Sequence, residues 1–147
     1  MVDAELERRL QESAGAYLRG DVDRYLELIH HSDDYTLMSP HGGELVRGFD
    51  TSPETLQATR EFFRGGEASV DIEQTYESGD LTVIVAVERQ HGKIGGLPDQ
   101  DLSLRVTLVF RRTQAGWDLV HRHADPLVHP IGVNELAELA RGTAVAG

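Results

Sequence analysis

The first thirty residues carry apolar side chains at the spacing of an amphipathic helix. Asp3 can cap such a helix and Gly20 can end it, so we expect a helix over residues 3–19. A second, shorter helix is expected from Asp21, before a run of polar residues breaks the pattern at residues 30–34. The inner face of the first helix is formed by Leu6, Leu10, Ala14 and Tyr17.

Two short strands and a third helix are expected next. The strands are predicted at residues 35–39 and 44–48, because a turn rich in glycine separates two short runs with strand character. The third helix is capped either by Thr51, in a capping box, or by Ser52 before a proline. We expect this helix to run to about Arg64, where two glycines follow.

From residue 69 onward, apolar and polar residues alternate with the period of β-strands. Four strands are expected, at residues 69–77, 81–91, 102–112 and 116–125. On 81–91 both faces are apolar, which is typical of a strand covered on both sides. Glu88 and Arg89 near its end are interpreted as the point where the strand emerges into solvent. A short helix from Asn134 to Arg141 is expected afterwards.

The order of these elements predicts the fold class. Helices before a run of hairpin-connected strands indicate an α+β fold, in which helices cover one face of an antiparallel sheet. We expect one domain over residues 1–130, followed by a short helix and tail at 131–147. Because the other sheet face is left uncovered and 81–91 is apolar on both sides, we predict a homodimer formed through the sheet.

Composition and charge exclude several classes of partner and chemistry. The formal net charge is −11, which opposes binding to nucleic acid and to anionic membranes. The absence of cysteine excludes disulfides, thiol chemistry and zinc–thiolate sites. No run of residues resembles a signal peptide or is apolar enough to span a bilayer, so we expect a cytoplasmic protein.

The last predicted strand is the most informative segment for chemistry. Alternate side chains of a strand share a face, so His121, His123 and Asp125 are expected on one side, together with Trp117 and Leu119. Two imidazoles and a carboxylate are costly to bury without partners. Their row is therefore expected to open on a pocket, or to lie at a polar subunit interface or a sheet rim.

Several short segments, taken in order, resemble the nuclear transport factor 2-like superfamily and, within it, the SnoaL-like and ketosteroid isomerase-like branch. Together they cover about residues 5–128. The segments are Gly20-Asp21, Asp33 to Leu37, Pro40-His41-Gly42-Gly43, Gly48-Phe49-Asp50, Ser78 to Leu81, Leu104 to Thr107 and Trp117 to Asp125.

This resemblance implies a cystatin-like fold with an internal pocket. A cone-shaped, curved antiparallel sheet would wrap around the N-terminal helices, and dimers would form through the sheet. No cofactor is implied. The resemblance says little about the reaction, because the fold hosts isomerases, cyclases, hydrolases, dehydratases and binding domains without catalysis.

Two functions from different classes are compatible with these residues. In the first, a homodimeric pocket protein binds a small, largely apolar molecule, with Tyr17, Tyr35, His41 and Arg105 as candidate binding residues. In the second, a cofactor-independent isomerase, cyclase or dehydratase moves a proton on a carbonyl compound. Its candidate catalytic residues are His121, His123 and Asp125, with Arg105 or a tyrosine holding the oxyanion.

The same residues have structural and metal-binding interpretations. The spacing of His121, His123 and Asp125 could present ligands to zinc, with His41 as a further ligand, although the preferred prediction contains no metal. The two strand histidines could instead bond to neighbouring strands or to the partner subunit. For Arg105, an ion pair with a carboxylate such as that of Glu88 or Asp125 is preferred over a role as an anion clamp.

Overall fold

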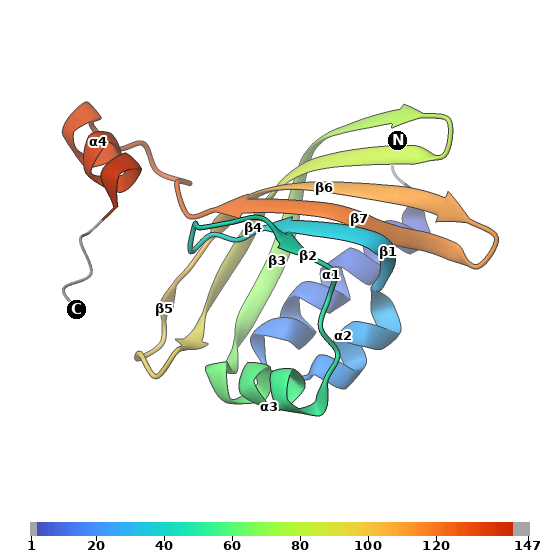
Figure 1. The fold of residues 1–147 in the computed structure, drawn as a ribbon, viewed down its shortest axis with the longest axis horizontal. Helices are drawn as coiled ribbons and strands as arrows, with labels where there is room; N and C mark the ends of the chain where they lie inside the picture. The colour runs from blue at the N-terminus through green and yellow to red at the C-terminus, as the bar shows by residue number, and fades with distance from the viewer. Residues whose placement is uncertain (1–2, 143–147) are drawn as a thin grey trace.

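The computed structural model describes residues 3–142 as a curved sheet that wraps around helices (Figure 1). The helices are α1 (Ala4–Leu18), α2 (Val22–Leu28), α3 (Pro53–Phe62) and α4 (Val133–Arg141). In spatial order, the sheet contains β2 (Val46–Arg47), β1 (His30–Met38), β7 (Gly116–Asp125), β6 (Leu104–Thr113), β4 (Leu81–Ile94) and β3 (Phe63–Ser78). A short strand, β5 (Gln100–Asp101), pairs with β4.

The predicted α+β class, with a curved sheet around the N-terminal helices, is confirmed. The sheet is mixed, however, because β1 runs parallel to its neighbour β7 while the other strand pairs are antiparallel. Both strands begin at the same end of the sheet, where His30 pairs with Asp118. The segment from residue 30 to 34, expected to interrupt the pattern, is the first half of β1.

Side-chain caps fix the helix starts where the sequence predicted them. The Asp3 carboxylate accepts from the backbone N–H groups of the first turn of α1, and Asp21 does the same for α2. Of the two candidates for α3, Ser52 is the cap, and Pro53 occupies the first turn. Helix α3 ends at Phe62, two residues earlier than predicted.

The early end of α3 is connected with the two glycines that were expected to follow the helix. Gly65 and Gly66 belong to β3, with φ values of 138° and 148°. Gly66 faces Gly92 of β4, and a Cβ on Gly66 would lie 2.0 Å from the carbonyl oxygen of His91. The glycines therefore let two long strands pair closely where the sheet bends.

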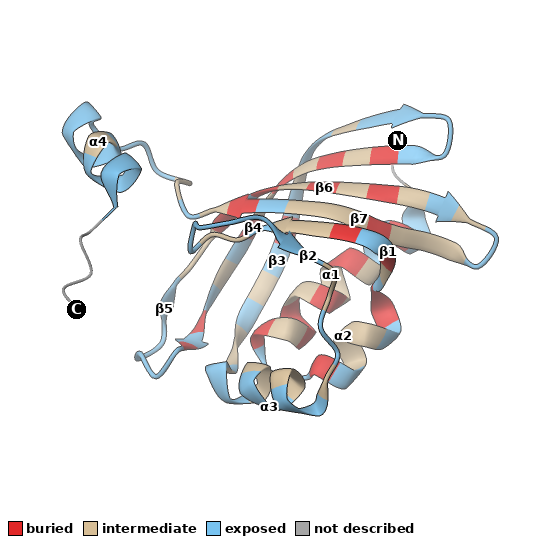
Figure 2. Ribbon diagram, viewed as in Figure 1, coloured by how far each residue is buried: buried red, intermediate tan, exposed pale blue. Residues whose placement is uncertain are grey.

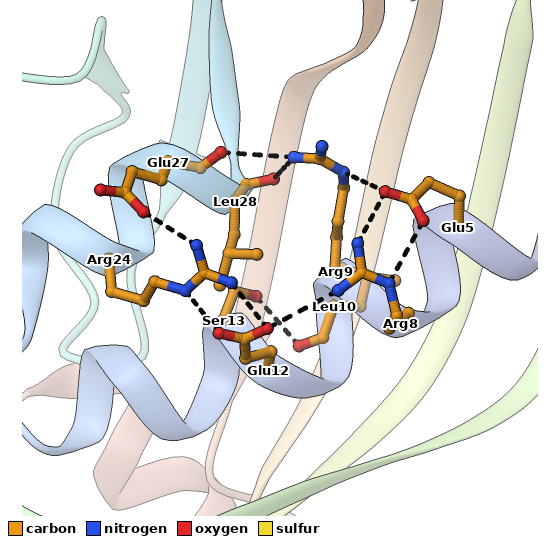
Figure 3. A network of polar contacts seen from close by, with 9 residues as sticks. All are labelled: Glu5, Arg8, Arg9, Leu10, Glu12, Ser13, Arg24, Glu27 and Leu28. Atoms are coloured by element: carbon orange, nitrogen blue, oxygen red, sulfur yellow. Dashed lines mark hydrogen bonds and ion pairs between the residues drawn. The ribbon is translucent and has the colours of Figure 1, made fainter.

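A polar network holds α2 against α1 (Figure 3). The Arg9 guanidinium donates to the carbonyl oxygens of Glu27 and Leu28, at 3.3 and 3.2 Å, and so satisfies carbonyls at the end of α2. Arg24 of α2 pairs with Glu12 of α1 and with Glu27. This attachment sets the position of the β1 strand that follows α2.

The hydrophobic core lies between the concave face of the sheet and α1 (Figure 2). Alternate residues of β4 and β6 point into it, as the strand period requires. The most deeply buried large side chains are Leu6, Leu18, Ile84 and Phe110. Burial of this one face leaves the convex face of the sheet for other contacts.

A β-bulge in β7 changes which of its residues face the core. Phe110 of β6 pairs with Leu119, but the preceding Val109 pairs with His121, so Val120 is an extra residue in β7. After the bulge, Arg122 lies on the concave face with Leu119, because it pairs with the buried Leu108. The prediction that Trp117 and Leu119 share a face with His121, His123 and Asp125 is therefore wrong.

The convex face carries an apolar strip flanked by polar residues. Val83, Val85 and Val87 of β4 are half-buried there, beside Val109 of β6. Tyr76 of β3, which pairs with Val83, is 59% exposed. Within residues 3–142, the helices that pack on the sheet lie on its concave side (Figure 1).

Helix α4 stands apart from the rest of the fold at the C-terminal end (Figure 1). Its apolar side chains Val133, Leu136 and Leu139 are all exposed. None of the described helices combines the length and apolarity needed to cross a membrane.

Candidate functional site

A cavity of about 210 Å³ lies between the concave face of the sheet and helices α1 and α2. Most of its wall is apolar or aromatic, and includes Leu10, Ile29, Phe49, Phe63, Leu104 and Phe110. His41 and Phe62, which also contribute to the wall, are exposed, so the cavity reaches solvent at the end that they line. The shape is typical of a pocket for a small ligand.

A larger groove of about 620 Å³ lies elsewhere, between the ends of β3 and β4 and residues 126–129. Its wall includes Glu67, His91, Asp101 and His129, all of which are exposed. Solvent screens charges in such an open groove. The smaller cavity is the better candidate site because its polar groups are removed from bulk water.

An ion pair between two sheet strands forms the polar part of the cavity wall. Arg122 of β7 donates from Nη1 and Nη2 to the two carboxylate oxygens of Glu88 of β4, each over 2.7 Å. The side chains are only 22% and 10% exposed. Burial disfavours the charged guanidinium, but the charge and hydrogen bonds of Glu88 outweigh it, so the pKa of Arg122 is raised.

Three tyrosines, Tyr17, Tyr25 and Tyr35, belong to the same cavity wall as this pair. The Tyr25 hydroxyl is hydrogen-bonded to His31 Nε2 over 3.0 Å, and the His31 ring stacks on Phe49 at 3.9 Å. The Tyr17 and Tyr35 hydroxyls have no hydrogen-bond partner among the described residues. No buried side-chain polar atom of these residues lacks a partner, so the two hydroxyls are accessible, and their residues line the cavity.

Burial holds the tyrosines of the cavity wall, and His31 bonded to one of them, in their neutral forms. Burial raises the pKa of Tyr35 to about 12, and burial also raises the pKa of Tyr17 and of Tyr25. Burial, followed by the charge of His30, lowers the pKa of His31 from 6.5 to about 4. Near neutral pH, the cavity therefore presents neutral tyrosine hydroxyls beside one paired cation.

The structure divides the predicted site residues between two faces of the sheet. Tyr17, Tyr35 and His41 line the cavity, as a binding role requires. Arg105 lies on the convex face, where it pairs through two hydrogen bonds, of 2.9 and 3.0 Å, with Asp125. The ion pair preferred for Arg105 in the sequence analysis is thus present, and its partner is Asp125.

The three predicted catalytic residues lie on the convex face, away from the cavity wall. Asp125 is held by Arg105, which lowers the pKa of its carboxyl group. His121 Nδ1 is hydrogen-bonded to Thr36 Oγ1 of the neighbouring strand over 2.8 Å, and His123 is exposed. Within residues 3–142, no three histidine, aspartate or glutamate side chains are arranged to hold a metal ion.

The ion pair in the cavity was not predicted from the sequence. Glu88 was interpreted as the point where β4 emerges into solvent, but it is buried on the concave face. Arg122 was placed on the face opposite Leu119, because the bulge at Val120 has no signal in the alternation of residue types. One signal was available, since Glu88 continues the concave series of Ile84 and Ala86 at a spacing of two.

The chain belongs to the SnoaL-like domain family, which matches residues 6–128. No curated protein is significantly similar to it. The predicted resemblance to SnoaL-like and nuclear transport factor 2-like proteins is therefore confirmed.

Solved structures support the same fold. An NTF2-like protein of unknown function from Shewanella oneidensis is 23% identical, with a TM-score of 0.59, over 82% of this chain and 96% of that one. The CamKII hub homology domain of Chlamydamonas reinhardtii is 20% identical, with a TM-score of 0.59, over 83% and 95%. A proposed dehydratase of the NTF2-like family from Streptomyces avermitilis is 23% identical, with a TM-score of 0.55, over 84% and 95%. These similarities show the fold alone.

Proposed function

We propose that this protein binds a small, largely apolar molecule in the concave cavity and acts as a homodimer. The observation that carries the binding proposal is the combination of an apolar, aromatic wall with a desolvated ion pair at one place in it. Burial of apolar ligand surface against such a wall favours binding, while a few polar groups fix the orientation of the ligand.

The volume of the cavity limits the size of the ligand. An apolar cavity of about 150 Å³ is known to accept benzene. The cavity here, at about 210 Å³, is moderately larger and partly polar. A molecule with one six-membered ring and a short substituent fits this volume.

Binding is tested by a nuclear magnetic resonance titration with toluene. Toluene should shift amide signals of residues around the cavity, and Ala14→Leu, which fills the cavity from α1, should abolish the shifts. Ala58→Leu on the exposed surface of α3 is the matched control and should bind toluene like the wild type. Toluene shifts that persist unchanged in Ala14→Leu would refute binding in this cavity.

The homodimer proposal rests on the convex face. Its strip of valines is only half-buried in the single chain, and apolar strips of this kind mark protein interfaces. One structure with the same fold is a hub homology domain, which supports self-association. In this arrangement, His121 and His123 would contact the partner subunit.

Sedimentation measurements on two lysine variants test the dimer. Val85→Lys places a charge in the middle of the strip and should yield a monomer. Leu97→Lys introduces the same charge at an exposed turn and should leave the mass unchanged. A monomeric wild type at micromolar concentration would overturn the proposal.

Proton-transfer catalysis on a carbonyl compound is the alternative function. The positions of the three candidate residues, His121, His123 and Asp125, argue against it, because a general base must lie within hydrogen-bonding distance of its substrate. The cytoplasmic location, and the lack of nucleic-acid and membrane partners, stay predictions from composition.

A further inference from the structure

We propose that the cavity selects ligands whose polar end is an uncharged acceptor oxygen, such as a ketone or ester carbonyl, over ligands that end in a carboxylate. This inference rests on the proposed binding function and adds the chemical class of the ligand. Three features of the wall support it. They are a free donor on Arg122, two free tyrosine hydroxyls, and the neutralisation of the Arg122 charge by Glu88.

The first feature is the Nε–H group of Arg122. The guanidinium meets Glu88 through its two Nη atoms, and each bond uses one N–H of each nitrogen. Nε has no acceptor among the described residues, yet no buried side-chain nitrogen or oxygen of these residues is unpartnered. Nε is therefore accessible, and because Arg122 lines the cavity, it offers a charged donor to a ligand.

The second feature is a pair of tyrosine hydroxyls in the same cavity wall. Tyr17 and Tyr35 come from α1 and β1, on different sides of the cavity. Both residues line the same cavity as Arg122, and burial keeps their hydroxyls neutral. A ligand oxygen in the cavity therefore meets neutral donors as well as the charged one.

The third feature decides between a neutral and an anionic ligand. Among the residues that line the cavity, the carboxylate of Glu88 already neutralises Arg122. A carboxylate ligand would bring a second negative charge beside Glu88 and would lose its hydration without a second cation to compensate. A carbonyl oxygen accepts the same hydrogen bonds without this cost.

Three probes of nearly the same size separate these possibilities. Acetophenone carries a neutral carbonyl, α-methylstyrene replaces that oxygen with a CH₂ group, and benzoate carries a carboxylate. Dissociation constants would be measured at pH 7 by the same amide-signal titration. We expect acetophenone to bind about tenfold more tightly than α-methylstyrene, since a hydrogen bond to a charged donor is worth at least that factor. Benzoate should bind most weakly.

Two variants connect this preference to the ion pair. Glu88→Gln leaves the charge of Arg122 unbalanced, so benzoate should become the tightest of the three probes. The double variant Glu88→Met with Arg122→Met removes the charged donor and leaves only the two tyrosine hydroxyls, so the preference for acetophenone over α-methylstyrene should shrink well below tenfold. The amide spectrum of each variant reports whether it is folded, and the double variant keeps the test available if Glu88→Gln unfolds.

Failure of the inference differs from failure of the proposed function. If α-methylstyrene and acetophenone bind the wild type equally, or benzoate binds best, the polar preference is wrong while binding in the cavity stands. If none of the three probes binds the wild type, the proposed function itself is overturned. A preference for acetophenone that is undiminished in the double variant also contradicts the inference, because Arg122 would not be its main source.

Discussion

Removing one partner of the Glu88–Arg122 pair should destabilise the protein strongly. In Glu88→Met, the guanidinium of Arg122 stays charged in an apolar cavity without the carboxylate that neutralises it. Breaking a buried pair in this way costs about 3–5 kcal/mol. The Arg122 side chain is 22% exposed, so water can partly solvate its unpaired charge. We therefore expect the lower end of that range, a loss of about 3 kcal/mol in the free energy of unfolding.

That magnitude is easily measured. In a domain of this length, each kcal/mol lowers the melting temperature by roughly 2–4 °C, so Glu88→Met should lower it by roughly 6–12 °C. Urea unfolding gives the free energy directly, provided that the slope of the transition is unchanged. The double variant, with Arg122→Met added, should recover most of the loss because no unpaired charge remains.

The convex face provides the matched control. Arg105 and Asp125 form a pair with similar two-bond geometry, at 2.9 and 3.0 Å, but their side chains are 55% and 33% exposed. Solvent screening limits such a pair to roughly 0–1 kcal/mol, so Arg105→Met should change stability little. Two results would refute this explanation. One is a loss of stability in Glu88→Met no larger than that in Arg105→Met. The other is a loss in the double variant equal to the sum of the losses in Glu88→Met and Arg122→Met.

Three further predictions concern other parts of the fold. Burial lowers the pKa of His31 to about 4, so between pH 6.5 and 4 the unfolded chain binds more protons than the folded chain. The free energy of unfolding should therefore decrease as the pH is lowered through this range. His31→Gln should flatten this dependence in pH-dependent urea titrations, while His129→Gln at the surface should not. Gly66→Ala should cost roughly 1–3 kcal/mol more than Gly65→Ala in urea, because only the Gly66 methyl would strike backbone. Deleting residues 131–147 should leave the melting temperature unchanged by calorimetry, because α4 packs on little of the described fold.

The sequence predicted the order of elements and their boundaries mainly where side chains act locally. Asp3, Asp21 and Ser52 bond to backbone N–H groups within their own helix turn, so the information is contained in a few neighbouring residues. The mixed sheet was not predicted in this way. Whether β1 lies parallel or antiparallel to β7 depends on which strands become neighbours after the intervening residues 39–115 have folded.

The faces of the strands were predicted only up to the first bulge. In β3, strict alternation would put Val70, Ile72 and Tyr76 on one face. Val70 and Ile72 do face the core, but Glu73 is an extra residue, so Tyr76 lies on the convex face. In β7, Val120 has the same effect. An extra residue moves all later side chains of the strand to the opposite face without changing the alternation of residue types. The pattern alone therefore gives the wrong face on one side of the bulge in β3 and in β7.

The bulge at Val120 also explains how one strand contributes to two different surfaces. Without it, the alternation that places Leu119 in the core would place His121 and His123 there as well, and Arg122 would lie on the convex face. The extra residue exchanges these sets, so a single arginine with a carboxylate partner enters the cavity and the histidines remain near solvent. Burying Arg122 requires one carboxylate, which Glu88 supplies from β4, whereas burying the histidine row would require partners for two imidazoles. The local irregularity in the sheet thus determines both the polarity of the cavity and the surface available to a second subunit.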